Sequence, residues 1–232
     1  MQGMQPSQGD SQWFDVEGIS HEEPAKMTSE LLEANIALSS YGGDLPVGLS
    51  VCWAGHVSNV QFQVLRRGDV VFVAFAGTNE WADMWRHVWV RREKIGDGIM
   101  VHRGWLADWQ RCIPVVYSVL REQMESLSTR VVFIGHSYGG ALAQIAAWYI
   151  AHEYGAPRVH LRTYGSPRAG NGNFAKDLDR RTESHYRYVV KGDPVVQTPL
   201  AFRYRHGGTK MLMPFHKSPH SMAGYLKSIS GE

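Results

Sequence analysis

Apolar and polar residues follow one another along this chain in the two periods that distinguish strands from helices. The runs 70–75 and 131–134 are continuously apolar and contain β-branched residues, which predicts strands buried on both faces. The stretch 60–65 alternates apolar and polar residues and precedes a turn at 66–69, which predicts a hairpin. Two further strands are predicted at 159–164 and 185–190.

The segments between these strands carry apolar residues at helical spacing. Helices are predicted at 25–41, 171–181 and 221–226. A long helix is predicted to follow the stretch 100–106 and to run to about 127, with a kink or restart at Pro114. Another is predicted from the end of the 131–134 strand to about 154. Strands that alternate with helices predict an α/β fold, with a mostly parallel central sheet and helices on both faces.

The chemistry of the chain is concentrated where the 131–134 strand ends, in the sequence Gly135-His136-Ser137-Tyr138-Gly139. Gly-x-Ser-x-Gly between a strand and a helix is typical of a sharp turn that exposes a nucleophilic serine. The small residues on either side let strand and helix pass closely, and the free N–H groups of the helix start favour an anion. Ser137 is therefore the candidate nucleophile. The alternative is a glycine-rich turn that happens to hold a serine.

A second candidate element is the exit of the 70–75 strand, Phe75-Ala76-Gly77-Thr78. Ligands of an open α/β sheet bind beyond the carboxyl ends of its strands, so we expect Thr78 to face Ser137. Acyl transfer needs donors for the oxyanion, and we assign them to the backbone N–H of Tyr138 and to Thr78. A turn without a catalytic part is the alternative for Thr78.

The acid and the base are expected after the nucleophile. Asp193 directly follows the 185–190 strand, where a carboxylate can orient an imidazole and stabilise its charged form. An Asx turn before Pro194 is the alternative. Asp177 and Asp179 lie among basic residues and are predicted to form a solvated helix face.

Three histidines follow Asp193, namely His206, His216 and His220. His206 lies between an alternating stretch and two glycines and is predicted to belong to a hairpin. His220 opens the terminal helix and is our candidate base, with His216 and His206 as alternatives. A metal site at His216 and His220 is disfavoured because Pro219 interrupts the helix that such a pair would need. The proposed chemistry needs no cofactor.

Tryptophans recur every fourth residue at Trp81, Trp85 and Trp89, so on a helix they form one stripe. Packing on the sheet is one interpretation of this stripe. The other is a flap beside the pocket that contacts a lipid surface, because tryptophan favours the boundary between water and lipid.

Composition limits the remaining classes. The 232 residues suit a single domain, predicted at 25–232 after a loose N-terminal arm at 1–24. A net charge of +2 with interspersed signs gives little attraction for nucleic acid. No run approaches a transmembrane length, and the first ten residues show no apolar signal sequence, so a cytoplasmic location or signal-independent export is expected. Cys52 and Cys112 are predicted as free thiols, with one disulfide as the alternative.

Together these motifs resemble the class 3 lipases of the α/β-hydrolase superfamily, which include fungal triacylglycerol lipases and feruloyl esterases. The resemblance spans about 25–230. It rests on Phe75-Ala76-Gly77-Thr78, Val101-His102-Arg103-Gly104-Trp105, the elbow from Gly135 to Ala141, Gly165-Ser166-Pro167-Arg168-Ala169-Gly170-Asn171, Gly192-Asp193-Pro194-Val195, and His220 with Tyr225 behind it.

The resemblance implies an α/β-hydrolase fold, a triad of Ser137, Asp193 and His220, an oxyanion hole at Thr78 and Tyr138, and a flap at 81–100. The expected substrate is an ester, most simply an acylglycerol lipid, with transient contact to a lipid interface. A phospholipase, a short-chain or feruloyl-type esterase, and a non-catalytic binding protein on the same scaffold are the alternatives.

Overall fold

A computed structural model describes residues 28–78, 91–124, 126–155 and 158–231. The predicted arm at 1–24 and the tryptophans at 81, 85 and 89 lie outside these described residues. In the described part, no helix is long and apolar enough to cross a membrane.

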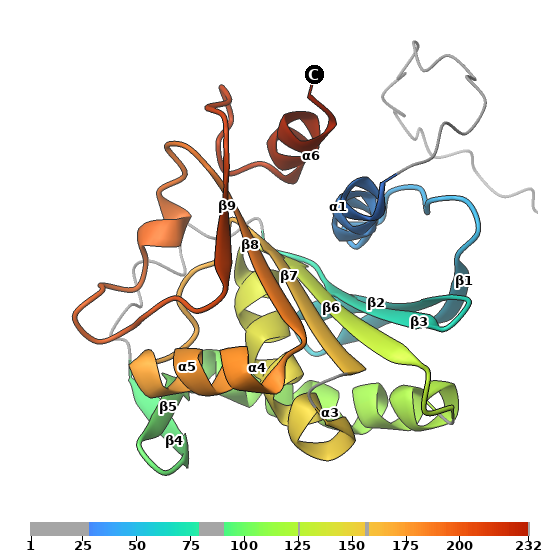
Figure 1. The fold of residues 1–232 in the computed structure, drawn as a ribbon, viewed down its shortest axis with the longest axis horizontal. Helices are drawn as coiled ribbons and strands as arrows, with labels where there is room; N and C mark the ends of the chain where they lie inside the picture. The colour runs from blue at the N-terminus through green and yellow to red at the C-terminus, as the bar shows by residue number, and fades with distance from the viewer. Residues whose placement is uncertain (1–27, 79–90, 125, 156–157, 232) are drawn as a thin grey trace, which may run out of the picture.

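A seven-stranded sheet forms the centre of the molecule, in the order β1-β2-β3-β6-β7-β8-β9 (Figure 1). Its strands are β1 (Ser50–Val57), β2 (Val60–Arg67), β3 (Val70–Phe75), β6 (Arg130–His136), β7 (Val159–Tyr164), β8 (Ser184–Val190) and β9 (Thr209–Met213). The first three strands pair antiparallel, and every pairing from β3 to β9 is parallel. The prediction of a mostly parallel sheet is confirmed.

Helices cover both faces of this sheet, also as predicted. Helices α1 (Ser29–Ser39) and α6 (Met222–Ser230) lie on one face, and α3 (Arg103–Gln123), α4 (Tyr138–Tyr154) and α5 (Gly172–Arg181) lie on the other (Figure 1). A short 3-10 helix, η2 (Val195–Gln197), follows β8. Each face has its own apolar core, so the sheet is buried on both sides.

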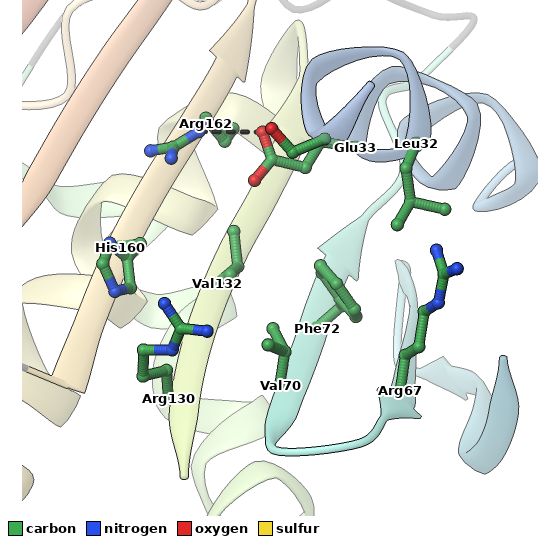
Figure 2. A pocket seen from close by; sticks show the side chains of 10 residues that line it. Leu32, Glu33, Arg67, Val70, Phe72, Arg130, Val132, His160 and Arg162 are labelled. Carbon is green, nitrogen blue, oxygen red and sulfur yellow. Dashed lines mark hydrogen bonds and ion pairs between the residues drawn. The ribbon is translucent and has the colours of Figure 1, made fainter. Parts of the chain in front are cut away.

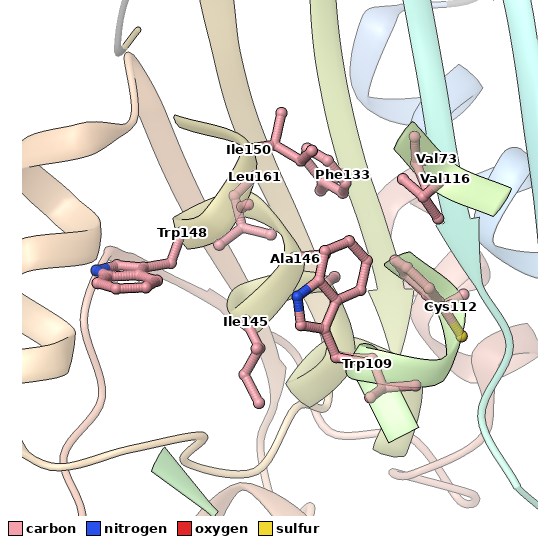
Figure 3. Packing of buried hydrophobic residues seen from close by; sticks show 14 of the residues in the cluster. Val73, Trp109, Cys112, Val116, Phe133, Ile145, Ala146, Trp148, Ile150 and Leu161 are labelled. Carbon is pink, nitrogen blue, oxygen red and sulfur yellow. The ribbon is translucent and has the colours of Figure 1, made fainter. Parts of the chain in front are cut away.

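The larger core holds α4 in place behind the nucleophile turn. Every residue from 131 to 148 is buried, because α4 is apolar on all sides and is enclosed by the sheet, α3 and α5. Figure 3 shows Trp109 of α3 beside Ala146 of α4, and Phe133 of β6 in the same layer. Such dense packing fixes the start of α4, where Ser137 lies.

Several predicted elements differ from the structure. Helix α3 continues through Pro114, so of the two alternatives predicted there, a kink or a restart, the restart was wrong. His206 does not lie in a hairpin, because Arg205 bridges to Gly170 and the following β9 pairs parallel to β8. Strand β1 and the small antiparallel pair β4 (Arg92–Gly96) and β5 (Ile99–His102) were not predicted.

A pocket of about 300 Å³ opens at the amino ends of the parallel strands, on the α1 face (Figure 2). Its lining includes Arg67, Arg130 and a buried ion pair between Arg162 and Glu33, whose Nε and Oε2 atoms are 2.9 Å apart. The carboxyl ends of the same strands carry the predicted site residues, so this pocket belongs to the opposite end of the sheet.

Candidate active site

Ser137 occupies a strained turn between β6 and α4. Its φ of 56° and ψ of −126° lie outside the common regions for a residue with a side chain. The turn can form only because its flanks are small: a Cβ at Gly135 would overlap the carbonyl of Gly139, and a Cβ at Gly139 would overlap the carbonyl of Phe75. The strain places the hydroxyl of Ser137 at the carboxyl end of the sheet.

The structure brings the three predicted triad residues together. The Nε2 atom of His220 lies 2.8 Å from the Oγ atom of Ser137, and its Nδ1 atom lies 2.9 Å from Oδ2 of Asp193. The carboxylate is fully buried and the imidazole is 17% exposed. A buried acid, an imidazole and a hydroxyl in this order form the arrangement that activates a serine for attack.

The other two candidate histidines have different partners. His206 bonds through Nε2 to the carbonyl of Val196, and burial lowers its pKa to about 3. His216 accepts a hydrogen bond from the backbone N–H of Ser218. Among the three candidates, only His220 is placed between Ser137 and Asp193.

Asp193 is held by donors that the sequence did not assign. The backbone N–H of Val195 donates to Oδ1 over 2.8 Å, and the hydroxyl of Tyr225 donates to Oδ2 over 2.7 Å. The same hydroxyl accepts a bond from the backbone N–H of Val190 at the end of β8. Tyr225 therefore ties α6, the strand and the carboxylate together, and only its place in the family motif gave a sequence signal.

His136 connects the nucleophile turn to the backbone of His220. Burial lowers the pKa of His136 to about 3, so its ring is neutral and carries one N–H. Its Nε2 atom lies 2.7 Å from the carbonyl oxygen of His220, which can only accept, so the proton is on Nε2. Nδ1 then accepts a hydrogen bond of 2.5 Å from the hydroxyl of Tyr41.

Tyr41 is a site residue that no sequence motif pointed to. Burial raises the pKa of its hydroxyl to about 12, so the group remains a donor. It lies in the turn after α1, far from the other site residues in sequence, and its hydroxyl also bonds to the backbone at Gly77. The hydroxyl of Tyr41 thus links Gly77, which follows β3, to His136 in the nucleophile turn.

The two predicted oxyanion donors lie at the expected ends of their strands. The N–H of Tyr138 is the first in α4, where N–H groups have no partner within the helix. The side chain of Tyr138 is engaged elsewhere, because its hydroxyl donates to Asp108 over 2.7 Å. Thr78 follows β3 and lines the same pocket as Ser137 and His220.

This pocket has a volume of about 380 Å³. It is lined by Leu38, Tyr41, Thr78, His136, Ser137, His220, Ser221, Met222 and Ala223. Apolar side chains from α1 and α6 stand beside the polar reacting groups, which suits a ligand that has both an aliphatic part and a polar group. The predicted flap tryptophans lie outside the described residues, and their role stays a prediction.

Other predicted features can be placed within the described part of the chain. No cluster of three or more His, Cys, Asp or Glu side chains suited to a metal ion occurs there. Cys52 and Cys112 are both free thiols. His102, which belongs to one of the family motifs, caps α3 by accepting a hydrogen bond from the N–H of Trp105.

Comparison with solved structures first defines the fold as that of the fungal lipases. Lipase II from Rhizopus niveus matches with a TM-score of 0.71 and 23% identity, over 79% of each chain. The Rhizomucor miehei lipase propeptide complex matches with a TM-score of 0.72 and 23% identity, over 82% of this chain and 69% of that chain. These neighbours have the α/β-hydrolase fold, which confirms the predicted fold class.

Comparison of sequences then gives the family. The model of the class 3 lipases matches residues 72–203, which is more than half of the chain, so this chain belongs to the class 3 lipase family. The predicted family is thereby confirmed.

Two curated relatives illustrate the range of this family. A secreted mono- and diacylglycerol lipase 1 of Fusarium solani is 38% identical over 111 residues, covering 47% of this chain and 33% of the relative. Phospholipase A1-II 1 of Oryza sativa subsp. indica is 30% identical over 218 residues, covering 77% of this chain and 55% of the relative. The chain therefore spans between a third and about half of these relatives' length.

Proposed function

We propose that this chain is a serine hydrolase that cleaves carboxylic esters, and that its substrates are acylglycerol lipids. The observation that carries the proposal is the position of His220, which is within hydrogen-bond distance of both Ser137 and Asp193. Membership of the class 3 lipase family supports the same chemistry.

In the proposed cycle, His220 takes the proton of Ser137 as its oxygen attacks the ester carbonyl. Asp193 accepts the Nδ1–H of His220 and stabilises the imidazolium. Thr78 and the N–H of Tyr138 hold the oxyanion. His220 then protonates the leaving alcohol, and water repeats the same steps on the acyl-enzyme, which releases the acid. The cycle consists of proton and acyl transfers only, so no cofactor takes part in it.

The apolar wall of the pocket favours an acyl chain as the part of the substrate that binds there, since Leu38, Met222 and Ala223 stand beside the reacting groups. The Fusarium relative is named for mono- and diacylglycerols, which supports an acylglycerol substrate. A phospholipid is the second candidate, because the rice relative, which covers more of this chain, is named a phospholipase A1. A short-chain or feruloyl-type esterase would use the same triad.

Labelling with a fluorophosphonate tests the chemistry directly. We expect the probe to modify the folded protein at Ser137, and the variant Ser137→Ala to remain unlabelled. Labelling that is absent in the folded protein, or that is unchanged in Ser137→Ala, would leave a non-catalytic scaffold as the better interpretation. Hydrolysis rates of a diacylglycerol, a phosphatidylcholine and a short-chain aryl ester then rank the substrate classes.

A further inference from the structure

Exposed apolar side chains gather in the last part of the chain, beside the candidate active site. Of the nine large hydrophobic side chains that are exposed among the described residues, five lie between Tyr186 and Phe215. Two of these are close to the triad in sequence: Leu212 is 60% exposed and Phe215 is 66% exposed. Exposed apolar side chains that lie together mark surfaces that contact a protein or a membrane, whereas single ones do not.

The pairing of β8 with β9 brings Leu212 and Phe215 close to the turn that leads to Asp193. Leu212 pairs with Val189, and the N–H of Lys191 bonds to the carbonyl of Met213. A Cβ at Gly192 would stand 3.4 Å from the ring of Phe215, so this ring lies against the turn that leads to Asp193. Leu212 lies near the carboxyl end of β9, the outer strand of the sheet (Figure 1), and Phe215 follows this strand.

The same part of the chain is rich in positive charge. Between residues 184 and 231 the sequence has seven basic residues and a single acid, Asp193, which is buried against His220. Lys191, Lys210 and Lys217 are exposed, and none of them forms an ion pair with another described residue. We name Lys191, Lys210, Leu212, Phe215 and Lys217 the β9 edge.

We propose that the β9 edge seats this chain on a lipid surface that carries anionic headgroups. Leucine and phenylalanine enter the boundary between headgroups and acyl chains, and flanking lysines bind the negative charge. The location favours lipid over an acidic protein, because Asp193 lies two residues after Lys191 and His220 lies three residues after Lys217. Seating at this edge thus brings an ester in the surface to the triad, a benefit that rests on the proposed function.

Lysine in the outer strand also blocks pairing with the edge of a second copy. Lys210 lies two residues before Leu212 in β9 and so points to the same face. A second copy of this chain is therefore the less favoured occupant, and the experiment distinguishes it.

Vesicle sedimentation with the Ser137→Ala variant tests seating without hydrolysis. We expect Ser137→Ala to bind vesicles that contain phosphatidylglycerol more tightly than pure phosphatidylcholine vesicles, and salt to weaken this binding. Replacing each of Lys191, Lys210 and Lys217 by glutamine should lower the partition constant about fivefold, or about a hundredfold together. Phe215→Ser should weaken binding to both kinds of vesicle.

Two substitutions elsewhere serve as matched controls. Lys176→Gln removes an exposed lysine of α5, and Val47→Ser removes an apolar side chain that is 91% exposed before β1. Both should leave vesicle binding unchanged. The triple lysine variant with Ser137 intact should hydrolyse a soluble short-chain ester at the parental rate, which shows that the fold and the triad are preserved.

Equal binding to both kinds of vesicle, or binding that the triple lysine variant retains, would overturn the proposal. A dimer in light scattering that Phe215→Ser dissociates, together with no vesicle binding, would assign the edge to a second copy instead. Failure of Ser137 to react with a fluorophosphonate affects only the proposed function, because sedimentation does not depend on hydrolysis.

Discussion

Removing the hydroxyl of Tyr225 should destabilise the protein and slow the reaction. Tyr225 is fully buried, donates to Asp193 over 2.7 Å and accepts a bond from the N–H of Val190 over 3.1 Å. The variant Tyr225→Phe keeps the ring but leaves a buried carboxylate with one donor fewer and a buried N–H without an acceptor. A hydrogen bond to a charged group contributes about 1.5–3 kcal/mol, so we expect a total loss of about 2–4 kcal/mol in the free energy of unfolding.

The same core offers a matched control. Tyr164 is also fully buried, and its ring lies 6.2 Å from that of Tyr225, but its hydroxyl has no hydrogen-bond partner among the described residues. Tyr164→Phe makes the same chemical change where no bond is lost. We expect the free energy of unfolding of Tyr164→Phe to stay within about 0.5 kcal/mol of the parental value or to exceed it, because the substitution removes an unsatisfied buried hydroxyl.

Urea denaturation followed by circular dichroism gives both free energies, and ester hydrolysis gives kcat and KM. For Tyr225→Phe we expect kcat to fall about tenfold at unchanged KM, since the carboxylate that orients His220 is less firmly held. Equal losses of stability in the two variants would refute the reasoning. So would a Tyr225→Phe enzyme with parental kcat.

Three further predictions concern other parts of the site. Tyr41→Phe leaves Nδ1 of His136 without its donor and should lower kcat about tenfold with little effect on KM, as measured with a soluble ester. His206 has a pKa of about 3 when folded, below the 6.5 of an exposed histidine, so the unfolded chain binds a proton that the folded chain excludes. Stability should therefore fall below about pH 6.5, by about 1.4 kcal/mol per pH unit for this group, and His206→Gln should show a shallower dependence in urea titrations. Gly135→Ala forces a Cβ into the carbonyl of Gly139 and should yield little soluble protein, whereas a soluble variant with parental melting temperature would contradict the strain at this turn.

The parts of the site that follow strands could be predicted from the sequence. Ser137, Thr78 and Asp193 come directly after buried apolar runs, and parallel strands bring their carboxyl ends to one edge. The order of residue types then pointed to a late histidine. Tyr41 could not be found this way, because its role depends on how α1 ends above the sheet, which no local pattern records.

Edge strands and helix contacts account for the errors. Strand β1 is half exposed at the sheet edge and mixes polar and apolar residues, so it lacks the signal of a buried strand. Asp177 was predicted on a solvated face, yet it is buried, accepts a bond from the indole N–H of Trp148 and pairs with Arg181. Its burial follows from the packing of α5 on α4, a long-range contact.

Helix α6 is short, yet it follows His220 directly and supplies Tyr225. It packs on α1 and on the outer strands rather than inside the larger core. Local unfolding of the last helix alone would therefore separate the acid from its phenolic donor and release the loop that holds the imidazole, while the sheet and α4 remain folded. We therefore expect the arrangement of Asp193, His220 and Tyr225 to be lost before the sheet unfolds, and the amide protons of α6 to exchange earlier than those of β6.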